Sequence, residues 1–140
     1  MTKSKVIGSV SVYFHGDNLD PASVTQFLGV NPEAQWKAGE ERSLASGATA
    51  RARTGMWTLS AALSNYDVSE ALNRLVNALG RNFPGVLSLP GIESGYADIF
   101  VCISRDMSDA GYTVKLHNTD IASVSDAGLD IQLTVSVDED

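Results

Sequence analysis

The sequence predicts an α+β protein, a two-layer sandwich in which a mainly antiparallel sheet carries helices on one face. Several segments alternate strictly between apolar and polar residues, which is typical of strands with one covered face. Others repeat apolar residues at helical spacing between clear start and stop signals. The predicted elements follow the order β-α-β-α-β-β-α-β, which favours segregated layers over a purely parallel sheet.

The first strand is predicted at Val6–Phe14, where apolar residues occupy every second position. Asp20 before Pro21 predicts the start of a short helix, with a capping carboxylate followed by proline at the first helical position. Gly29 should end this helix in a left-handed conformation. Residues 34–56 show no clean period and are predicted to form a long irregular loop.

The middle of the chain predicts a strand at Trp57–Leu63 and then the clearest helix. Asp67 and Glu70 have the spacing of a capping box, and the apolar residues behind them recur at helical intervals as far as Gly80. Residues 82–90 should form a short helical or turn-rich piece.

The last third is predicted to be mostly strand. Residues 97–104 and 112–117 alternate on either side of an expected turn, and residues 118–128 should form a helix. The segment 129–137 alternates most cleanly, so its odd-numbered residues are expected to face the core: Leu129, Ile131, Leu133, Val135 and Val137.

A faint internal repeat allows a second interpretation of this order. Residues 20–24 (DPASV) and 120–124 (DIASV) match at four of five positions. Each of these two segments follows a predicted strand that ends in an aromatic or aliphatic residue plus a histidine. The repeat would fit a pseudo-duplication of two β-α-β halves. The same letters are also ordinary helix-start chemistry, so both interpretations stay open.

Composition predicts one domain over residues 1–140 and excludes several classes of protein. Hydrophobic residues make up 44% of the chain and charged residues 19%, as in soluble globular proteins. The sequence has no apolar run long enough for a membrane span and no apolar block of a signal peptide. The single cysteine, Cys102, excludes an internal disulfide. A cytoplasmic protein without a membrane partner is therefore expected.

The formal net charge of −7 is distributed unevenly. Residues 1–70 hold six basic and seven acidic side chains, whereas residues 71–140 hold four and ten. This balance argues against a nucleic-acid partner. The acidic half either keeps the protein soluble or meets a basic partner protein.

The most promising functional stretch lies between the two tryptophans. Four of the ten basic residues fall there, which gives a predicted ligand-binding set of Trp36, Lys37, Arg51, Arg53 and Trp57, with Arg42 in the same cluster. Arg51 and Arg53 would point the same way on an extended backbone and could hold a phosphate, a carboxylate or an acidic loop. Alternatively, these arginines pair internally with Glu40, Glu41 or the acidic half, and both tryptophans belong to the core.

Other chemistry is weakly represented. His15 with Asp17 and Asp20 could bind a metal or do acid–base work, and His117 would join them if both histidines lie at one end of the sheet. No metal-binding spacing occurs, so no metal or cofactor is predicted. Cys102 has no neighbouring basic residue in the sequence to activate it, and the serines lie in no nucleophile motif. No catalytic residue is predicted, and the sequence leans away from an enzyme.

The landmarks between residues 16 and 57 resemble a known family. They are a Gly-Asp-x-Leu-Asp-Pro turn, a helix ending Leu-Gly-Val with a proline behind it, a Trp-x-x-Gly-Glu, and a Gly-x-Trp that enters a strand: Gly16, Asp17, Leu19, Asp20, Pro21, Leu28, Gly29, Val30, Pro32, Trp36, Gly39, Glu40, Gly55 and Trp57. This order resembles the bacterial family of domain of unknown function 4279. The resemblance implies a small α+β domain that usually stands alone, without an established activity or catalytic residues.

Three functions are consistent with the sequence. The first is a non-catalytic binding or protein-interaction module, for which an immunity-type partner of a toxin is an example by analogy alone. The second is a small-anion or acidic-ligand binding protein, or an enzyme, that uses the region of Arg51, Arg53 and Trp57. The third is a self-associating homodimer with a structural role.

Overall fold

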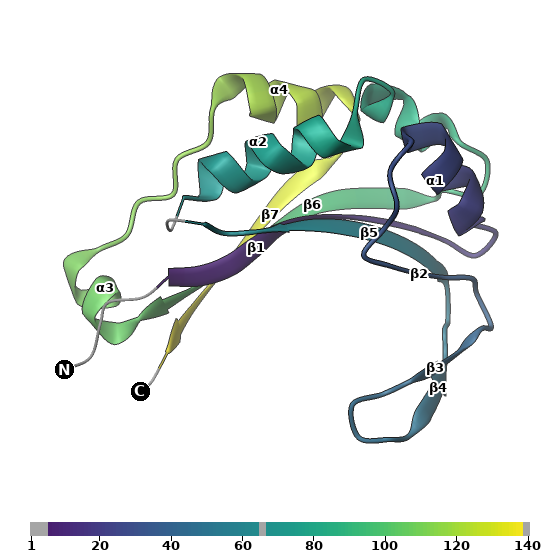
Figure 1. Ribbon diagram of the computed structural model, residues 1–140, viewed down its shortest axis with the longest axis horizontal. Coiled ribbons are helices and arrows are strands. Elements are labelled where there is room, and N and C mark those ends of the chain that lie inside the picture. The colour runs from purple at the N-terminus through teal and green to yellow at the C-terminus, as the bar shows by residue number, and fades with distance from the viewer. Residues whose placement is uncertain (1–5, 65–66, 139–140) are drawn as a thin grey trace.

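The computed structural model describes residues 6–64 and 67–138 and confirms the α+β class (Figure 1). Five strands form one sheet in the order β2-β5-β1-β6-β7, and the helices pack on one face of it. A separate two-stranded hairpin, β3–β4, projects on the opposite side. None of the helices in the described ranges is long and apolar enough to cross a membrane.

Most predicted elements are present, with bounds that differ by a few residues. The strands are β1 (Val6–Gly16), β2 (Ala34–Trp36), β3 (Glu41–Ser43), β4 (Thr49–Arg51), β5 (Gly55–Ala62), β6 (Ser94–Ser104) and β7 (Asp130–Asp138). The helices are α1 (Pro21–Leu28), α2 (Val68–Leu79), the 3₁₀ helix η1 (Phe83–Ser88), α3 (Arg105–Ala110) and α4 (Asn118–Asp126).

Strand β1 is the centre of the sheet. It pairs antiparallel with β5 on one side and with β6 on the other, whereas β6 and β7 pair in parallel. A parallel pair needs a long crossover, and here the chain makes it through α3 and α4. The predicted mainly antiparallel sheet is therefore confirmed, with one parallel pair at its edge.

The core lies between the sheet and the helices because β1 alternates. Val10, Val12 and Phe14 are fully buried in the core. Trp57 of β5 joins them with 0% exposure, and its indole nitrogen donates to the Thr25 hydroxyl at 3.0 Å. Burying the ring therefore leaves no unpaired polar atom on it.

The predicted helix ends are confirmed at α2 but only partly at α1. The Asp67 carboxylate accepts a hydrogen bond from the Glu70 backbone N–H at 3.2 Å, and Gly29 after α1 adopts φ 75°. The predicted capping role of Asp20 is wrong, because its carboxylate accepts from the Ser23 hydroxyl and not from a backbone N–H. Pro21 therefore sets the start of α1 without that bond.

The segment 34–56 is more regular than predicted. It contains β2, which adds to the sheet beside β5, and the β3–β4 hairpin. Each of these strands has only three residues. Three residues give too few positions for a period to be recognised in the sequence, which explains the incorrect prediction of a loop.

The predicted strand at 112–117 is also wrong. This segment has no strand pairing in the structure, and α3 stands where a turn was expected. Tyr112, Val114 and Leu116 pack partly buried against the core, so the alternation reflects one-sided packing of an extended segment. The second half of the suggested pseudo-duplication thus lacks its first strand.

Three residues at the end of β7 face the core side as predicted but are not buried there. Leu133, Val135 and Val137 are exposed by 52%, 51% and 42%. Their register with Ile99, Val101 and Ile103 puts them on the core side of the sheet. They are exposed because β7 is the edge strand and the helices leave this row uncovered.

A close backbone contact fixes the end of β1 next to the hairpin. A Cβ atom on Gly16 would lie 1.8 Å from the Gly91 carbonyl oxygen, so only glycine fits there. The Glu93 backbone N–H donates to the His15 carbonyl at 2.8 Å, and the Glu93 carboxylate accepts from the Asp17 N–H at 2.5 Å. These contacts hold His15 in place.

We expect Leu72→Ala to lower the free energy of unfolding by about 2–5 kcal/mol, because it opens a cavity under α2. Leu133→Ala is the matched control, since the same atoms are removed from an exposed side chain, and it should cost under about 1 kcal/mol. Urea unfolding at low micromolar protein measures both. Equal losses of stability would contradict the difference in burial between Leu72 and Leu133.

Candidate functional site: a basic hollow beside the bare sheet face

The face of the sheet opposite the helices carries an aromatic patch. Alternation along β1 directs Tyr13 and His15 to this face, and the register puts Tyr96 of β6 beside Tyr13. The Tyr13 and Tyr96 rings are 5.2 Å apart, and the His15 ring lies 6.3 Å and 6.1 Å from them, nearly parallel to both. We call this side of the sheet the bare face.

The β3–β4 hairpin forms a wall at one end of the bare face (Figure 1). Its base is closed by two backbone hydrogen bonds, from Gly39 to the Ala52 carbonyl at 2.8 Å and from Ala52 to the Glu40 carbonyl at 2.9 Å. Ala52 is buried at this junction with 8% exposure. The base is therefore fixed while the arms reach into solvent.

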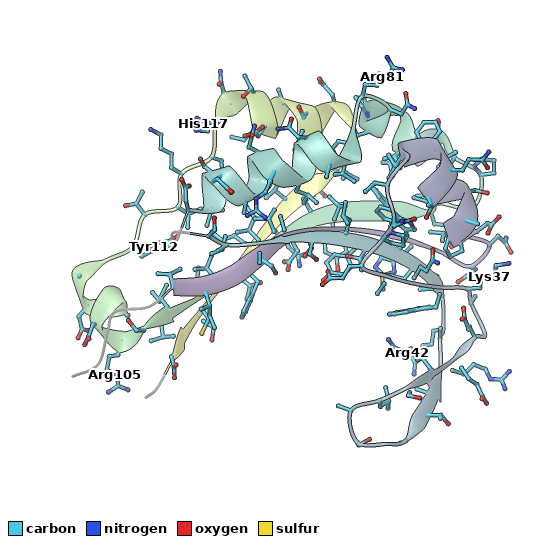
Figure 2. All side chains as sticks on the ribbon, viewed as in Figure 1. Lys37, Arg42, Arg81, Arg105, Tyr112 and His117 are labelled. Atoms are coloured by element: carbon cyan, nitrogen blue, oxygen red, sulfur yellow. The ribbon has the colours of Figure 1, made fainter. Side chains whose placement is uncertain are left out.

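Trp36 and Arg42 connect the hairpin to the sheet. Trp36 is the last residue of β2 and shares the side of His15 and Met56 on the neighbouring strands. The guanidinium carbon of Arg42 lies 4.3 Å from the centre of the Trp36 ring, a cation–π contact. Figure 2 shows Arg42 between the hairpin and the sheet, and Lys37 at the outer edge.

These elements enclose a hollow of about 350 Å³, which we call the hairpin hollow. The described residues that line it include three arginines and no carboxylate: His15, Trp36, Met56, Arg42, Arg51 and Arg53. In a chain with a net charge of −7, this is a local concentration of positive charge. Such a hollow suits a carboxylate or a phosphate.

Arg51 and Arg53, which the sequence predicts to act together, both line the hairpin hollow. The hairpin register pairs Arg51 with Glu41 and Arg42 with Ala50, so the side chains of Arg51 and Arg42 lie on opposite faces of the hairpin. The Arg51 guanidinium is 3.8 Å from the Glu41 carboxylate, and both side chains are exposed. This pair matches the alternative of internal charge pairing, although an exposed pair contributes little. For Arg53, no ion pair occurs among the described residues.

A second hollow of about 650 Å³ lies on the other side of Trp36, and we call it the edge hollow. It is lined by the start of α1 and residues 35–40, including Asp20, Lys37 and Glu40. The Lys37 backbone N–H donates to the Glu40 carboxylate at 2.8 Å. Trp36 lines both hollows, whereas Lys37 lines only this one.

The remaining candidates lie elsewhere. Trp57 is in the core and does not line either hollow. His117 precedes α4 on the helix side of the sheet, away from His15 (Figure 2). Within the described ranges, no three His, Cys, Asp or Glu side chains are grouped so that they could hold a metal ion. Cys102 is partly buried on β6.

Comparison with known proteins gives one match. The sequence model of a family described as a domain of unknown function, DUF4279, matches residues 5–138. The chain belongs to the DUF4279 family. No curated protein and no solved structure matches it. Several landmarks that carry the resemblance surround the hollows of this DUF4279 protein: Gly16 fixes the end of β1, Trp36 separates the hollows, and Glu40 helps to close the base of the hairpin.

The sequence places Arg42 in the basic cluster but gives no sign that it belongs to the site. Its role depends on the hairpin register, which puts Arg42, and not Arg51, on the side of Trp36. The contribution of His15 depends in turn on the antiparallel register of β1 with β5 and β6. Neither register can be read from segments this short or this distant in the chain.

We expect His15 to make the protein less stable in acid. Burial lowers the pKa of His15 below its ordinary value of 6.5. The groups that face it are Tyr13 and Tyr96 in the sheet and the arginines of the hairpin hollow. Well above pH 6.5 the His15 imidazole is neutral in both the folded and the unfolded protein. As the pH falls below 6.5, the unfolded chain binds the proton first, so stability is lost down to the lowered pKa.

Urea unfolding between pH 8 and pH 5 measures this loss. The His15→Gln variant should lose less stability than the wild type over this range, because it removes the imidazole that resists protonation. His117→Gln is the matched control, since it leaves His15 in place, and it should retain the acid loss. If the stability of the wild type and of His15→Gln fell in parallel with pH, His15 would not be the source of the acid loss.

Proposed function

We propose that this DUF4279 protein is a non-catalytic binding module that holds an acidic segment of a partner protein in the hairpin hollow. The observation that carries the proposal is the stacking of Arg42 on Trp36, beside described lining residues that include three arginines and no carboxylate. The other residues of the site add shape and charge to this contact.

The stacking prepares Arg42 for a carboxylate. With one face of the guanidinium held against the indole ring, its N–H groups remain available at the edges for a bidentate contact. Arg53, for which no ion pair is described, supplies a second cation from the same wall. The Met56 side chain, 5% exposed, adds apolar surface at the base.

The surroundings of Trp36 favour an extended ligand over a small ion. Trp36 lines both hollows, so a chain that passes over this residue would contact both. The Arg51 side chain is 71% exposed, unlike the walls of small-molecule sites, which enclose most of their ligand. Lys37 in the edge hollow would meet the continuation of the same segment.

A second candidate is a small anion. The volume of the hairpin hollow, about 350 Å³, lies within the range of small-molecule pockets, roughly 300–1,000 Å³. Phosphate bound by Arg42 and Arg53 alone would use the same chemistry without a partner protein. The two candidates differ in which probe binds, and not in which residues bind it.

The test uses a fluorescently labelled octaglutamate peptide, with binding measured by polarisation at about 50 mM salt, where exposed charges are weakly screened. The Arg42→Ala/Arg53→Ala variant should bind at least about tenfold more weakly, because it loses charge-assisted hydrogen bonds of about 1.5–3 kcal/mol each. Its melting temperature should stay within a few degrees of the wild type, since both side chains are exposed.

Two controls sharpen this test. Arg81→Ala removes an exposed arginine from the helix side of the molecule (Figure 2) and should leave binding unchanged. Arg51→Ala should have a smaller effect than the double variant, because Arg51 already faces Glu41. If the double variant unfolds, Arg42→Lys keeps the charge but loses the planar fork and should still weaken binding.

Three results would change the conclusion. Unchanged peptide binding in the double variant would refute the proposed site. Equal losses with Arg81→Ala would indicate non-specific attraction. Binding of inorganic phosphate with the same arginine dependence, without binding of the peptide, would favour the small-anion candidate.

A further inference from the structure

Strand β7 leaves one edge of the sheet without a partner among the described strands. It pairs only with β6, and its nine residues run along the side of the sheet farthest from β2. Natural edge strands are usually protected by lysines, prolines or bulges. Between its terminal aspartates, β7 reads IQLTVSV, with no charge and no proline.

The same strand carries an exposed apolar row. Leu133, Val135 and Val137 are 52%, 51% and 42% exposed, and they continue the buried row of β6 that includes Ile99 and Val101. Parallel strands are normally covered on both faces, so an exposed apolar row on a parallel edge strand is unusual. The row marks β7 as a surface that another chain can cover.

We propose that β7 pairs antiparallel with β7 of a second copy of this chain, which joins two five-stranded sheets. The sequence of the strand is self-complementary when the twofold axis passes through Thr134. Val135 then lies opposite Leu133 of the second copy, and Val137 opposite Ile131, all on one face. On the other face, Gln132 lies opposite Ser136. All nine residues are paired in this register.

Charge predicts how this dimer responds to salt. Each copy carries a formal net charge of −7, so two copies repel each other when they approach. Added salt screens this repulsion, so the dimer should strengthen with salt, whereas association driven by ion pairs would weaken.

The size of the interface predicts a weak dimer. Nine residues span about 30 Å at about 3.3 Å per residue. A contact along one strand is therefore smaller than a standard interface, which buries about 800 Å² on each partner. The pairing stops at two copies, because the opposite edge is the three-residue strand β2, next to the hairpin. The hairpin hollow stays free in the dimer, so this inference does not depend on the proposed function.

Sedimentation velocity from about 5 to 500 μM protein tests association. The wild type should shift from monomer to dimer in this range, and more completely at 0.5 M than at 0.05 M sodium chloride. Val135→Lys should remain monomeric, whereas the matched control Gln26→Lys, on the exposed side of α1, should dimerise like the wild type. A wild type that is monomeric throughout, or a dimer that survives Val135→Lys, would overturn the proposal.

A disulfide tests the register directly, in a Cys102→Ser background. In the Thr134→Cys variant the cysteines of the two copies lie opposite each other. Their Cα atoms are about 4.5–5.5 Å apart, which a disulfide can bridge. Gln132→Cys is the control. In this register residue 132 lies opposite residue 136 of the second copy, so the two introduced cysteines are four residues, or about 13 Å, apart along the strand. Under mild oxidation, Thr134→Cys should give at least about tenfold more crosslinked dimer. Equal yields from both variants would overturn this register.

Discussion

The covering of only one face of the sheet is the constraint on which the rest of the structure depends. Strand β1 pairs with neighbours on both sides, so its alternate side chains have fixed and opposite environments. Val12 and Phe14 are buried under the helices, while Tyr13 and His15 point to the bare face. The same alternation therefore builds the core and leaves a polar and aromatic surface on the other side.

The candidate site exists because the chain leaves the sheet after β2, forms the β3–β4 hairpin on the bare side and returns to the sheet as β5 (Figure 1). Trp57 anchors β5 in the core, where its indole is hydrogen-bonded to Thr25. Trp36, one strand away, is only partly buried and meets Arg42 on the side of the hairpin. One tryptophan thus stabilises the fold, and the other remains available to a ligand.

How much the sequence predicts depends on the length of each element and on what covers it. Long periodic segments such as α2 follow from their own residues, because Leu72, Leu75 and the Asp67 cap act locally. The hairpin does not, since β3 and β4 are three residues each. The exposure of Val135 depends on which strand stands at the sheet edge. Arg42 belongs to the site only through a register that brings it, and not Arg51, to Trp36.

The two tryptophans allow a direct test of whether an acidic segment binds in the hairpin hollow. In a ¹⁵N-labelled protein titrated with octaglutamate, each indole N–H gives its own NMR signal. We expect the Trp36 signal and the backbone amides of residues 41–54 to shift, while the buried Trp57 signal stays in place. Shifts confined to residues 71–138, or an unmoved Trp36 signal at saturating peptide, would contradict binding in the hairpin hollow.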